Sequence, residues 1–472
     1  MMQAKIFFGS NEAVTDTFSE RKSPFNGEVV STAPICSEDD AKKALSIAQN
    51  ATVATKASTL AQRCNWLLDV ARKLKESKED IAKTITDEVG KPITFARVEV
   101  ERCIETITLC AETMRTMHGE TINTDAMDSG KKTMSFFRRE PVGVVVAITP
   151  FNFPLNLVAH KLGPALVAGN TVVLKPTPEA PLTSYKFAKL FIESEYAIKD
   201  ALSVVYGDAE VGSALISSDI PRVISFTGSV PVGNIITKNS GIKKIGLELG
   251  GNAATFIEKS ADLALAAQRC ALGAFVNSGQ VCISLQRIYV QDAIYDAFAA
   301  LMAEETKKLK VGSPYDDDTF MGPLIDDESA ERAMSWVESA IEEGAEPLLP
   351  PHREGRMFHP CVMANVTDDM AIVCEEVFAP IVSLVRVNSF DDALPRMNNS
   401  PYGLQFSVFT NDLSITNRAI DELNAGGIVI NDMPTLRFDI QPYGGVKLSG
   451  VGREGPRFAI EEMTEIKSIV IC

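Results

Sequence analysis

Short apolar runs alternate with amphipathic stretches over most of the chain. Residues 142–148 form an unbroken apolar run, which is typical of a strand buried on both faces of a parallel sheet. The same pattern predicts strands at 171–174, 202–206 and 222–226, with helices between them at about 155–168, 183–193, 209–217 and 231–239. This order of strands and helices indicates an α/β fold with a doubly wound sheet.

Two more regions extend this pattern. Residues from about 37 to 118 have helical spacing, with Ser37 as a candidate N-cap and Gly90-Lys-Pro92 as a helix end. A second alternation of strands and helices begins near Ala253 and runs to about Asn431. We therefore predict two doubly wound α/β domains, because a chain of 472 residues is too long for one compact core.

Two segments at the margins of these regions, 132–139 and 465–471, have the character of edge strands. An exposed strand edge leaves backbone groups unpaired, and pairing between subunits is one way to cover it. We therefore expect a small β element for oligomerisation, made of residues 119–140 and 450–472, and a homodimer or homotetramer.

Composition narrows the possible functions. The net charge of −16 argues against a nucleic-acid partner, which would normally meet a basic face. No apolar run approaches the roughly 20 residues of a membrane span, and the first residues lack the apolar core of a signal peptide. Nine cysteines without a Cys-x-x-Cys pair and four scattered histidines indicate neither a disulfide framework nor a zinc site. We expect a cytoplasmic protein with reduced thiols, no bound metal and no membrane partner.

The most informative residue is Cys282, in Asn277-Ser-Gly-Gln-Val-Cys282. Its glycine and small polar neighbours give the thiol backbone freedom and access. Glu248 lies between Leu247 and Leu249, where loss of water would raise the carboxyl pKa toward the range of a general base. Together the two residues suggest covalent catalysis followed by hydrolysis, although a cysteine taken alone is more often a buried, small apolar residue.

Polar segments follow three of the predicted strands, at 149–154, 175–178 and 226–229. In open α/β sheets, ligands bind beyond the carboxyl ends of the strands. Asn152 stands among two prolines and two aromatic residues, as an amide that stabilises developing negative charge would; the alternative is an ordinary turn residue. A Gly-x-Gly-x-x-Gly fingerprint is absent, but Gly228-Ser-Val-Pro-Val-Gly233 opens a helix whose free N–H groups suit a pyrophosphate.

These segments, with Glu375-Glu376-Val-Phe378-Ala-Pro380 and Gln441-Pro-Tyr-Gly-Gly-Val-Lys-Leu-Ser-Gly450, resemble the NAD(P)-dependent aldehyde dehydrogenase superfamily in identity and order. The resemblance covers about residues 20–470. It implies that Cys282 is the nucleophile, Glu248 the general base, and Asn152 with the Cys282 N–H the oxyanion hole. The pattern from Gly452 to Met463 resembles the branch that holds lactaldehyde and non-phosphorylating glyceraldehyde-3-phosphate dehydrogenases.

The resemblance also implies a role for each part of the chain. Residues 1–118 and 141–247 would form a dinucleotide-binding domain, 248–431 the catalytic domain, and 432–449 a loop near the substrate tunnel. The residues that match cofactor contacts of the family are Thr149, Phe151, Lys175, Thr177, Pro178, Gly228, Ser229, Leu249, Glu376 and Phe378. Pro178 stands where many NAD-preferring members carry an acid, so we expect NADP to be accepted, with use of NAD also open.

The implied reaction oxidises a small aldehyde to its carboxylic acid through a thioester on Cys282. Leu157 and His160 match positions that line the family's substrate tunnel, although a core histidine is at least as good an interpretation of His160. Arg437, with Arg102 as a weaker second candidate, would steer an anionic or hydroxylated substrate; the alternative for Arg437 is a surface or intersubunit ion pair.

Lys161 and Glu454 match positions of the family's proton route out of the site, with ordinary surface or cap charges as the alternative. Two rival functions stay open. A relative that passes its acyl group to coenzyme A, or that reduces an activated acid, typically lacks the hydrolytic acid, so Glu248 argues against it. A structural relative without catalysis is disfavoured by the intact set of Cys282, Glu248, Asn152 and Lys175.

Overall fold

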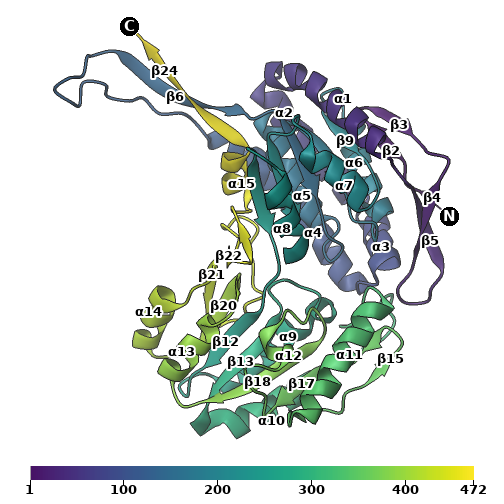
Figure 1. The fold of residues 1–472 in the computed structure, drawn as a ribbon, viewed down its shortest axis with the longest axis vertical. Helices are drawn as coiled ribbons and strands as arrows, with labels where there is room; N and C mark the ends of the chain where they lie inside the picture. Colours follow the sequence, from purple (N-terminus) through teal and green to yellow (C-terminus); the bar gives the residue numbers. More distant parts are fainter. Residues whose placement is uncertain (1) are drawn as a thin grey trace.

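Each of the two alternations of strands and helices forms its own sheet, and the sheets lie in separate lobes (Figure 1). The computed structural model describes residues 2–472. The lobe drawn in purple to teal contains the first half of the chain, and the lobe drawn in green contains most of the second half. This arrangement confirms the expected α/β fold with two doubly wound sheets.

The sheet of the first lobe has eight strands in the order β23-β11-β10-β7-β8-β9-β2-β3. Five neighbouring strands from β11 to β9 are parallel, and the strands at both edges are antiparallel. The strands are β2 (Ile6–Phe8), β3 (Asn11–Ala13), β7 (Val144–Ile148), β8 (Thr171–Lys175), β9 (Leu202–Val204), β10 (Val223–Thr227), β11 (Lys244–Glu248) and β23 (Gly450–Val451). The four strands predicted between residues 142 and 226 are β7 to β10, and all four are confirmed.

The helices of this lobe also follow the predicted pattern. They are α1 (Glu38–Ala57), α2 (Leu60–Glu76), α3 (Lys78–Val89), α4 (Ile93–Thr116), α5 (Asn156–Ala168), α6 (Pro181–Ile192), α7 (Ala209–Ser217), α8 (Val230–Asn239) and α15 (Pro456–Glu462). Ser37 caps α1 in a reciprocal capping box with Asp40, as its place in the sequence suggests. All 13 residues of α5 are buried, so this helix is held from every side and is a rigid support for the residues before it.

The amino-terminal strands were not predicted from the sequence. β1 (Met2–Gln3), β4 (Phe18–Lys22) and β5 (Val29–Pro34) form a three-stranded sheet, and β2 and β3 extend the large sheet. β4 is mostly exposed and reads Phe-Ser-Glu-Arg-Lys, so it lacks the apolar alternation that marks a half-buried strand. Pairing with β5, rather than burial, holds this segment extended.

The second lobe has a seven-stranded sheet in the order β14-β17-β18-β13-β12-β20-β21. Its strands are β12 (Ala253–Ile257), β13 (Leu285–Gln291), β14 (Glu346–Pro347), β17 (Cys361–Ala364), β18 (Ile381–Val387), β20 (Gln405–Phe409) and β21 (Gly427–Ile430). Its helices are α9 (Leu263–Phe275), α10 (Tyr295–Lys307), α11 (Asp327–Glu342), α12 (Ala371–Cys374), α13 (Phe390–Asn398) and α14 (Leu413–Glu422). No helix within residues 2–472 is both long and apolar enough to cross a bilayer.

A two-stranded ribbon projects from the first lobe, at the upper left of Figure 1. It pairs β6 (Met134–Pro141) with β24 (Thr464–Ile471) along their whole lengths. Residues 464–471 of the expected segment 450–472 belong to this ribbon. Residues 450–451 pair with β11, and α15 packs against α4 and α5.

Candidate active site

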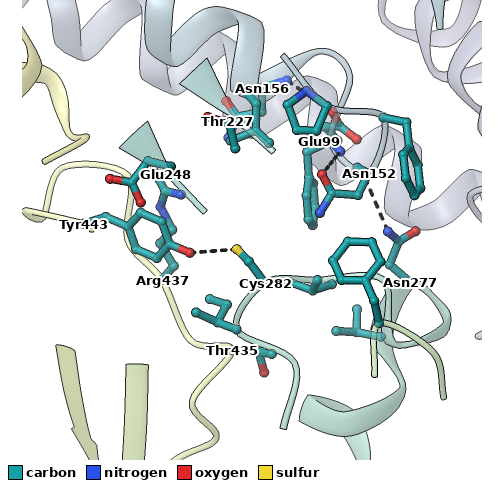
Figure 2. Close-up of a pocket in the computed structure, with 18 of the residues that line it drawn as sticks. Glu99, Asn152, Asn156, Thr227, Glu248, Asn277, Cys282, Thr435, Arg437 and Tyr443 are labelled. Carbon is teal, nitrogen blue, oxygen red and sulfur yellow. Dashed lines mark hydrogen bonds between the residues drawn. The ribbon is translucent and has the colours of Figure 1, made fainter. Parts of the chain in front are cut away.

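A cavity of about 550 Å³ is lined by residues of both lobes, and Figure 2 shows its centre. Thirteen of the residues singled out in the sequence line it: Cys282, Glu248, Asn152, Phe151, Gly228, Ser229, Leu249, Glu376, Phe378, Leu157, Arg437, Arg102 and Glu454. They come from segments up to about 350 residues apart, so the fold brings them together. Thr149, Lys175, Thr177, Pro178, His160 and Lys161 do not line this cavity.

A left-handed turn places Cys282 at the cavity. Asn277, Ser278 and Gly279 have φ values of 52°, 56° and 72°, a conformation that costs energy in the two residues with a Cβ. Ser278 Oγ donates to the Gly322 carbonyl at 2.8 Å, which helps to hold the turn. A Cβ at Gly279 would collide with the backbone of Ala379, so only glycine fits the third position. Of the small residues noted in the sequence, Gly279 is therefore required by the turn.

The Cys282 thiol is half-buried and lies 3.0 Å from the hydroxyl oxygen of Tyr443 (Figure 2). Burial raises the pKa of this thiol to about 12, and the hydrogen bond with Tyr443 opposes that shift. A thiol in such a position becomes a nucleophile only if neighbouring groups favour its ionised form.

Asn152 reaches from the segment before α5 to the loop that carries Cys282. Its side-chain nitrogen donates to the Gln280 carbonyl at 3.0 Å, and its side-chain oxygen accepts from the Phe153 N–H. A primary amide has two N–H donors, so one of them is left for another acceptor. Asn152 is buried, lines the cavity and is bonded to the loop that carries Cys282, as an oxyanion donor would be.

Glu248 ends strand β11 and is buried. Burial raises the pKa of its carboxyl group well above the usual range, and the nearby Glu454 carboxylate raises it further. One carboxyl oxygen, Oε2, has no hydrogen-bond partner within residues 2–472. This buried acid has the raised pKa that the sequence predicted from its apolar neighbours.

Behind Glu248, Glu454 joins two cations. Its carboxylate lies 3.0 Å from Arg437 Nη2 and 3.6 Å from Lys161 Nζ, and both cations are almost fully buried. Burial raises the pKa of Glu454, but His160, Lys161 and Arg437 together outweigh it and lower that pKa to about 2. Lys161 and Glu454 are thus neither surface nor cap charges, and they lie next to Glu248 as a proton route would require.

Asp439 joins the other charged groups of this wall. It accepts two hydrogen bonds from Arg102, at 3.0 and 2.7 Å, and one contact of 3.0 Å from His160 Nε2. Arg437 Nη2 lies 3.1 Å from the same His160 nitrogen. Arg437 is therefore a largely buried residue with ion pairs within the chain, and His160 is a core residue bonded to side chains that does not line the cavity.

The predicted residues at the end of strand β8 lie apart from this cavity. Lys175 is buried, and its ammonium has no hydrogen bond or ion pair within residues 2–472. Thr177 donates to Glu179, one residue beyond Pro178. Burial lowers the pKa of Lys175, and the Glu179 carboxylate opposes this shift. A carboxylate therefore acts on Lys175 from the residue that follows Pro178.

A model of the aldehyde dehydrogenase family matches residues 11–469. The chain belongs to the aldehyde dehydrogenase family. It is 44% identical to a 3-sulfolactaldehyde dehydrogenase of Priestia aryabhattai over 93% of this chain and 91% of that protein. It is 40% identical to a lactaldehyde dehydrogenase of Methanococcus aeolicus over 96% of this chain and 97% of that protein. These relatives confirm the family and the branch that the sequence motifs indicated.

The fold is that of solved aldehyde dehydrogenases. The crystal structure of an NADP-dependent glyceraldehyde-3-phosphate dehydrogenase from Bacillus halodurans, complexed with NADP, superposes with a TM-score of 0.97. It is 33% identical to this chain, and the match covers 99% of both. This aldehyde dehydrogenase is thus an oxidoreductase that converts a small aldehyde to the carboxylic acid.

The residues of this aldehyde dehydrogenase fit a nicotinamide dinucleotide. Lys175 offers a buried ammonium without a partner among residues 2–472, and α8 begins at Val230 with free N–H groups next to Gly228 and Ser229. Glu376 approaches the backbone so closely that a Cβ at Gly250 would collide with its carboxylate. Burial raises the Glu376 pKa to about 7, so a hydrogen-bonding partner such as a ribose would favour its ionised form.

Sequence reasoning missed four residues of this aldehyde dehydrogenase's cavity and its charged wall. Tyr443, Asp439 and Lys91 stand in segments noted for other reasons, and none of these residues or Glu99 was predicted to belong to the site. Lys91 and Glu99 form a fully buried ion pair that lines the cavity, and Glu99 Oε1 accepts from the N–H groups that begin α5. A charged pair in an otherwise helical segment carries no signal of burial, so only the fold could reveal it.

Proposed function

We propose that this aldehyde dehydrogenase oxidises a short 2-hydroxyaldehyde whose far end carries a negative charge. The observation that carries the proposal is that Arg102 and Arg437 line the same cavity as Cys282, Glu248 and Asn152. Together with Lys161, these arginines give the wall three positive charges. Asp439 and Glu454 supply two negative charges. The similar protein named for 3-sulfolactaldehyde agrees with this class, and the one named for lactaldehyde agrees with its 2-hydroxyaldehyde part.

In the first half of the proposed reaction, Cys282 is the nucleophile. Its sulfur bonds to the aldehyde carbon, and the carbonyl electron pair moves onto oxygen. The free N–H of the Asn152 amide and the Cys282 backbone N–H stabilise that oxyanion, which matches the way Asn152 bridges to the Cys282 loop. A nicotinamide dinucleotide, when bound, would supply the hydride acceptor by which the Cys282 adduct becomes a thioester.

In the second half, Glu248 is the general base. Its ionised carboxyl takes a proton from water, the resulting hydroxide displaces the Cys282 sulfur, and the acid leaves. The raised pKa of Glu248 makes it a stronger base than a solvated glutamate. The proton then leaves Glu248 by a route of which Glu454 and Lys161, 3.6 Å apart, form a part.

The cofactor is proposed to be NADP or NAD. Lys175, Thr177 and Pro178 would hold its adenosine ribose at the end of β8, with Thr149 at the end of the neighbouring β7. Gly228, Ser229 and Leu249 would lie along its pyrophosphate and nicotinamide, and Phe151, Phe378 and Glu376 would enclose the second ribose. Two similar solved structures hold NADP, from Bacillus halodurans and from Methanocaldococcus jannaschii.

We also infer a cytoplasmic homodimer or homotetramer that forms through the ribbon of β6 and β24. The ribbon exposes the apolar side chains of Met134, Ile466, Val470 and Ile471. Single exposed apolar residues are ordinary, but four on one two-stranded ribbon favour a protein interface. Sedimentation of the purified chain, compared with an Ile466→Lys variant, tests this assembly.

A panel of aldehydes tests the substrate class. Lactaldehyde, 3-sulfolactaldehyde and glyceraldehyde 3-phosphate are compared with propionaldehyde and succinate semialdehyde, each with NADP and with NAD. We expect the highest kcat/KM for the two anionic 2-hydroxyaldehydes. Equal values for propionaldehyde and lactaldehyde would remove the role of the 2-hydroxyl group, and equal values for lactaldehyde and 3-sulfolactaldehyde would remove that of the charge.

A further inference from the structure

Tyr443 is the side chain that contacts the reactive sulfur, and nothing in its motif explains why it carries a hydroxyl group. The hydroxyl oxygen lies 3.0 Å from Cys282 Sγ (Figure 2). That spacing is a hydrogen bond for a sulfur atom. Phenylalanine would fill the same apolar space, with Val281 and Ile283 around it, without making this contact.

The backbone holds Tyr443 rigidly in this place. Its N–H donates to the Glu454 carbonyl at 3.1 Å, and its carbonyl accepts from the Glu454 N–H at 2.6 Å. The Arg437 guanidinium carbon lies 3.7 Å from the centre of the phenol ring. A cation over the face of a phenol draws electron density from the ring and makes its O–H a better donor. Glu454 therefore fixes the backbone of Tyr443, and Arg437 acts on its phenol ring.

When the thiol ionises, only one direction is left for this hydrogen bond. The thiolate has no proton to give, so the phenol must be the donor. Burial raises the pKa of Tyr443 well above the usual range, so the phenol keeps its own proton near neutral pH. A bond donated to the charged form of a group favours that form.

We propose that Tyr443 is a catalytic residue that donates an O–H···S bond to the ionised Cys282 and so keeps the sulfur nucleophilic and aimed into the cavity. This role rests on the proposed function of Cys282. As the sulfur bonds to the aldehyde carbon, its negative charge passes to the substrate oxygen, and Tyr443 keeps its proton throughout. The hydroxyl is then free to donate to the substituent on the neighbouring carbon, which in a 2-hydroxyaldehyde is an oxygen.

Other charged groups also act on Cys282. Arg437 favours its ionised form, whereas Glu376 and Glu248 oppose it when they are ionised. Tyr443, in contrast, is uncharged and contacts the sulfur directly. Removing its hydroxyl should therefore act on the thiol without changing the net charge around it.

The test measures alkylation of Cys282 by iodoacetamide against pH, with and without NADP, in the wild type and in Tyr443→Phe. The matched control is Tyr295→Phe, which removes another buried hydroxyl, one that donates to the Leu384 carbonyl and does not line the cavity. We expect the profile of Tyr443→Phe to move to higher pH by about one unit, so that alkylation near pH 8 slows about tenfold. The control should match the wild type.

Replacement of Tyr443 by 3-fluorotyrosine keeps the shape and makes the phenol a better donor, so alkylation should become faster than in the wild type. This second variant remains informative if Tyr443→Phe folds poorly. A profile that moves in neither variant would overturn the proposal. Because alkylation uses no aldehyde, this result is independent of the substrate panel, and the panel can fail while the role of Tyr443 stands.

Discussion

Replacement of Glu248 by glutamine separates the two halves of the reaction. The change removes the base but keeps the shape of a buried side chain that has one oxygen without a partner within residues 2–472. Attack by Cys282 and oxidation to the thioester do not need Glu248, whereas hydrolysis of the thioester does. General bases typically contribute 10²–10⁴-fold, so we expect steady turnover to fall by about that factor.

The same change should stabilise the fold, and the size of the gain depends on pH. Glu248 has a folded-state pKa raised well above the ordinary value of 4.5, mainly by burial. An acid of this kind contributes stability that is present below pH 4.5 and is lost as the pH rises through its folded pKa. Glutamine does not titrate, so the variant gains on the wild type between pH 4.5 and 7, by at most about 3 kcal/mol at pH 7.

Two assays check these expectations. Rapid mixing with NADP and lactaldehyde should give a burst of reduced cofactor of one equivalent per active site, followed by the slow phase. Urea denaturation at pH 4.5 and pH 7 should show similar midpoints for both proteins at the lower pH and a higher midpoint for the variant at the higher pH. Steady turnover within tenfold of the wild type, or a variant that is less stable at pH 7, would refute this account of Glu248.

Three other changes test single features of the site. Asn152→Ala should lower kcat by about 10²–10³-fold, with a much smaller change in KM, because it removes one oxyanion donor; an effect on KM alone would contradict that role. Glu179→Gln should raise the kcat/KM ratio of NADP to NAD, on the order of tenfold, because it removes the negative charge beside Lys175, and an unchanged ratio would place the phosphate elsewhere. Glu99→Gln should cost about 3–5 kcal/mol of stability in urea denaturation, because Lys91 is then buried without its partner. The exposed Glu101→Gln on the same helix should cost less than about 1 kcal/mol of stability. Equal losses in the two variants would show that burial of the ion pair does not determine this cost.

The sequence predicted the parts of this fold that carry strong periodicity. Strand β7 is a continuous apolar run, and β8 to β10 are mostly apolar and buried, so their pattern marks strands of a sheet that is covered on both faces. Cys282, Glu248 and Asn152 were singled out because unusual neighbours surround each of them. β4 escaped prediction because its pairing is local and its side chains are polar and exposed. Asp439 escaped because one aspartate in a loop looks like many others until the fold sets it between Arg102 and His160.

The position of the charged wall implies that substrate charge and the general base are coupled. While Glu248 is protonated, Lys161, Arg102 and Arg437 outnumber Asp439 and Glu454 by one positive charge, since burial lowers the pKa of His160 and leaves it neutral. When Glu248 ionises, its negative charge balances this one excess positive charge.

An anionic substrate tail held by Arg437 balances the same positive charge, so it raises the pKa of Glu248. We therefore expect the rise of kcat with pH to lie at higher pH for 3-sulfolactaldehyde than for lactaldehyde, measured under conditions where hydrolysis of the thioester limits the rate. In Glu248→Gln this difference should vanish, because no carboxyl group remains at that position to titrate. Identical profiles for both substrates in the wild type would mean that the tail lies away from the arginines, and a difference that survives in the variant would assign it to another group.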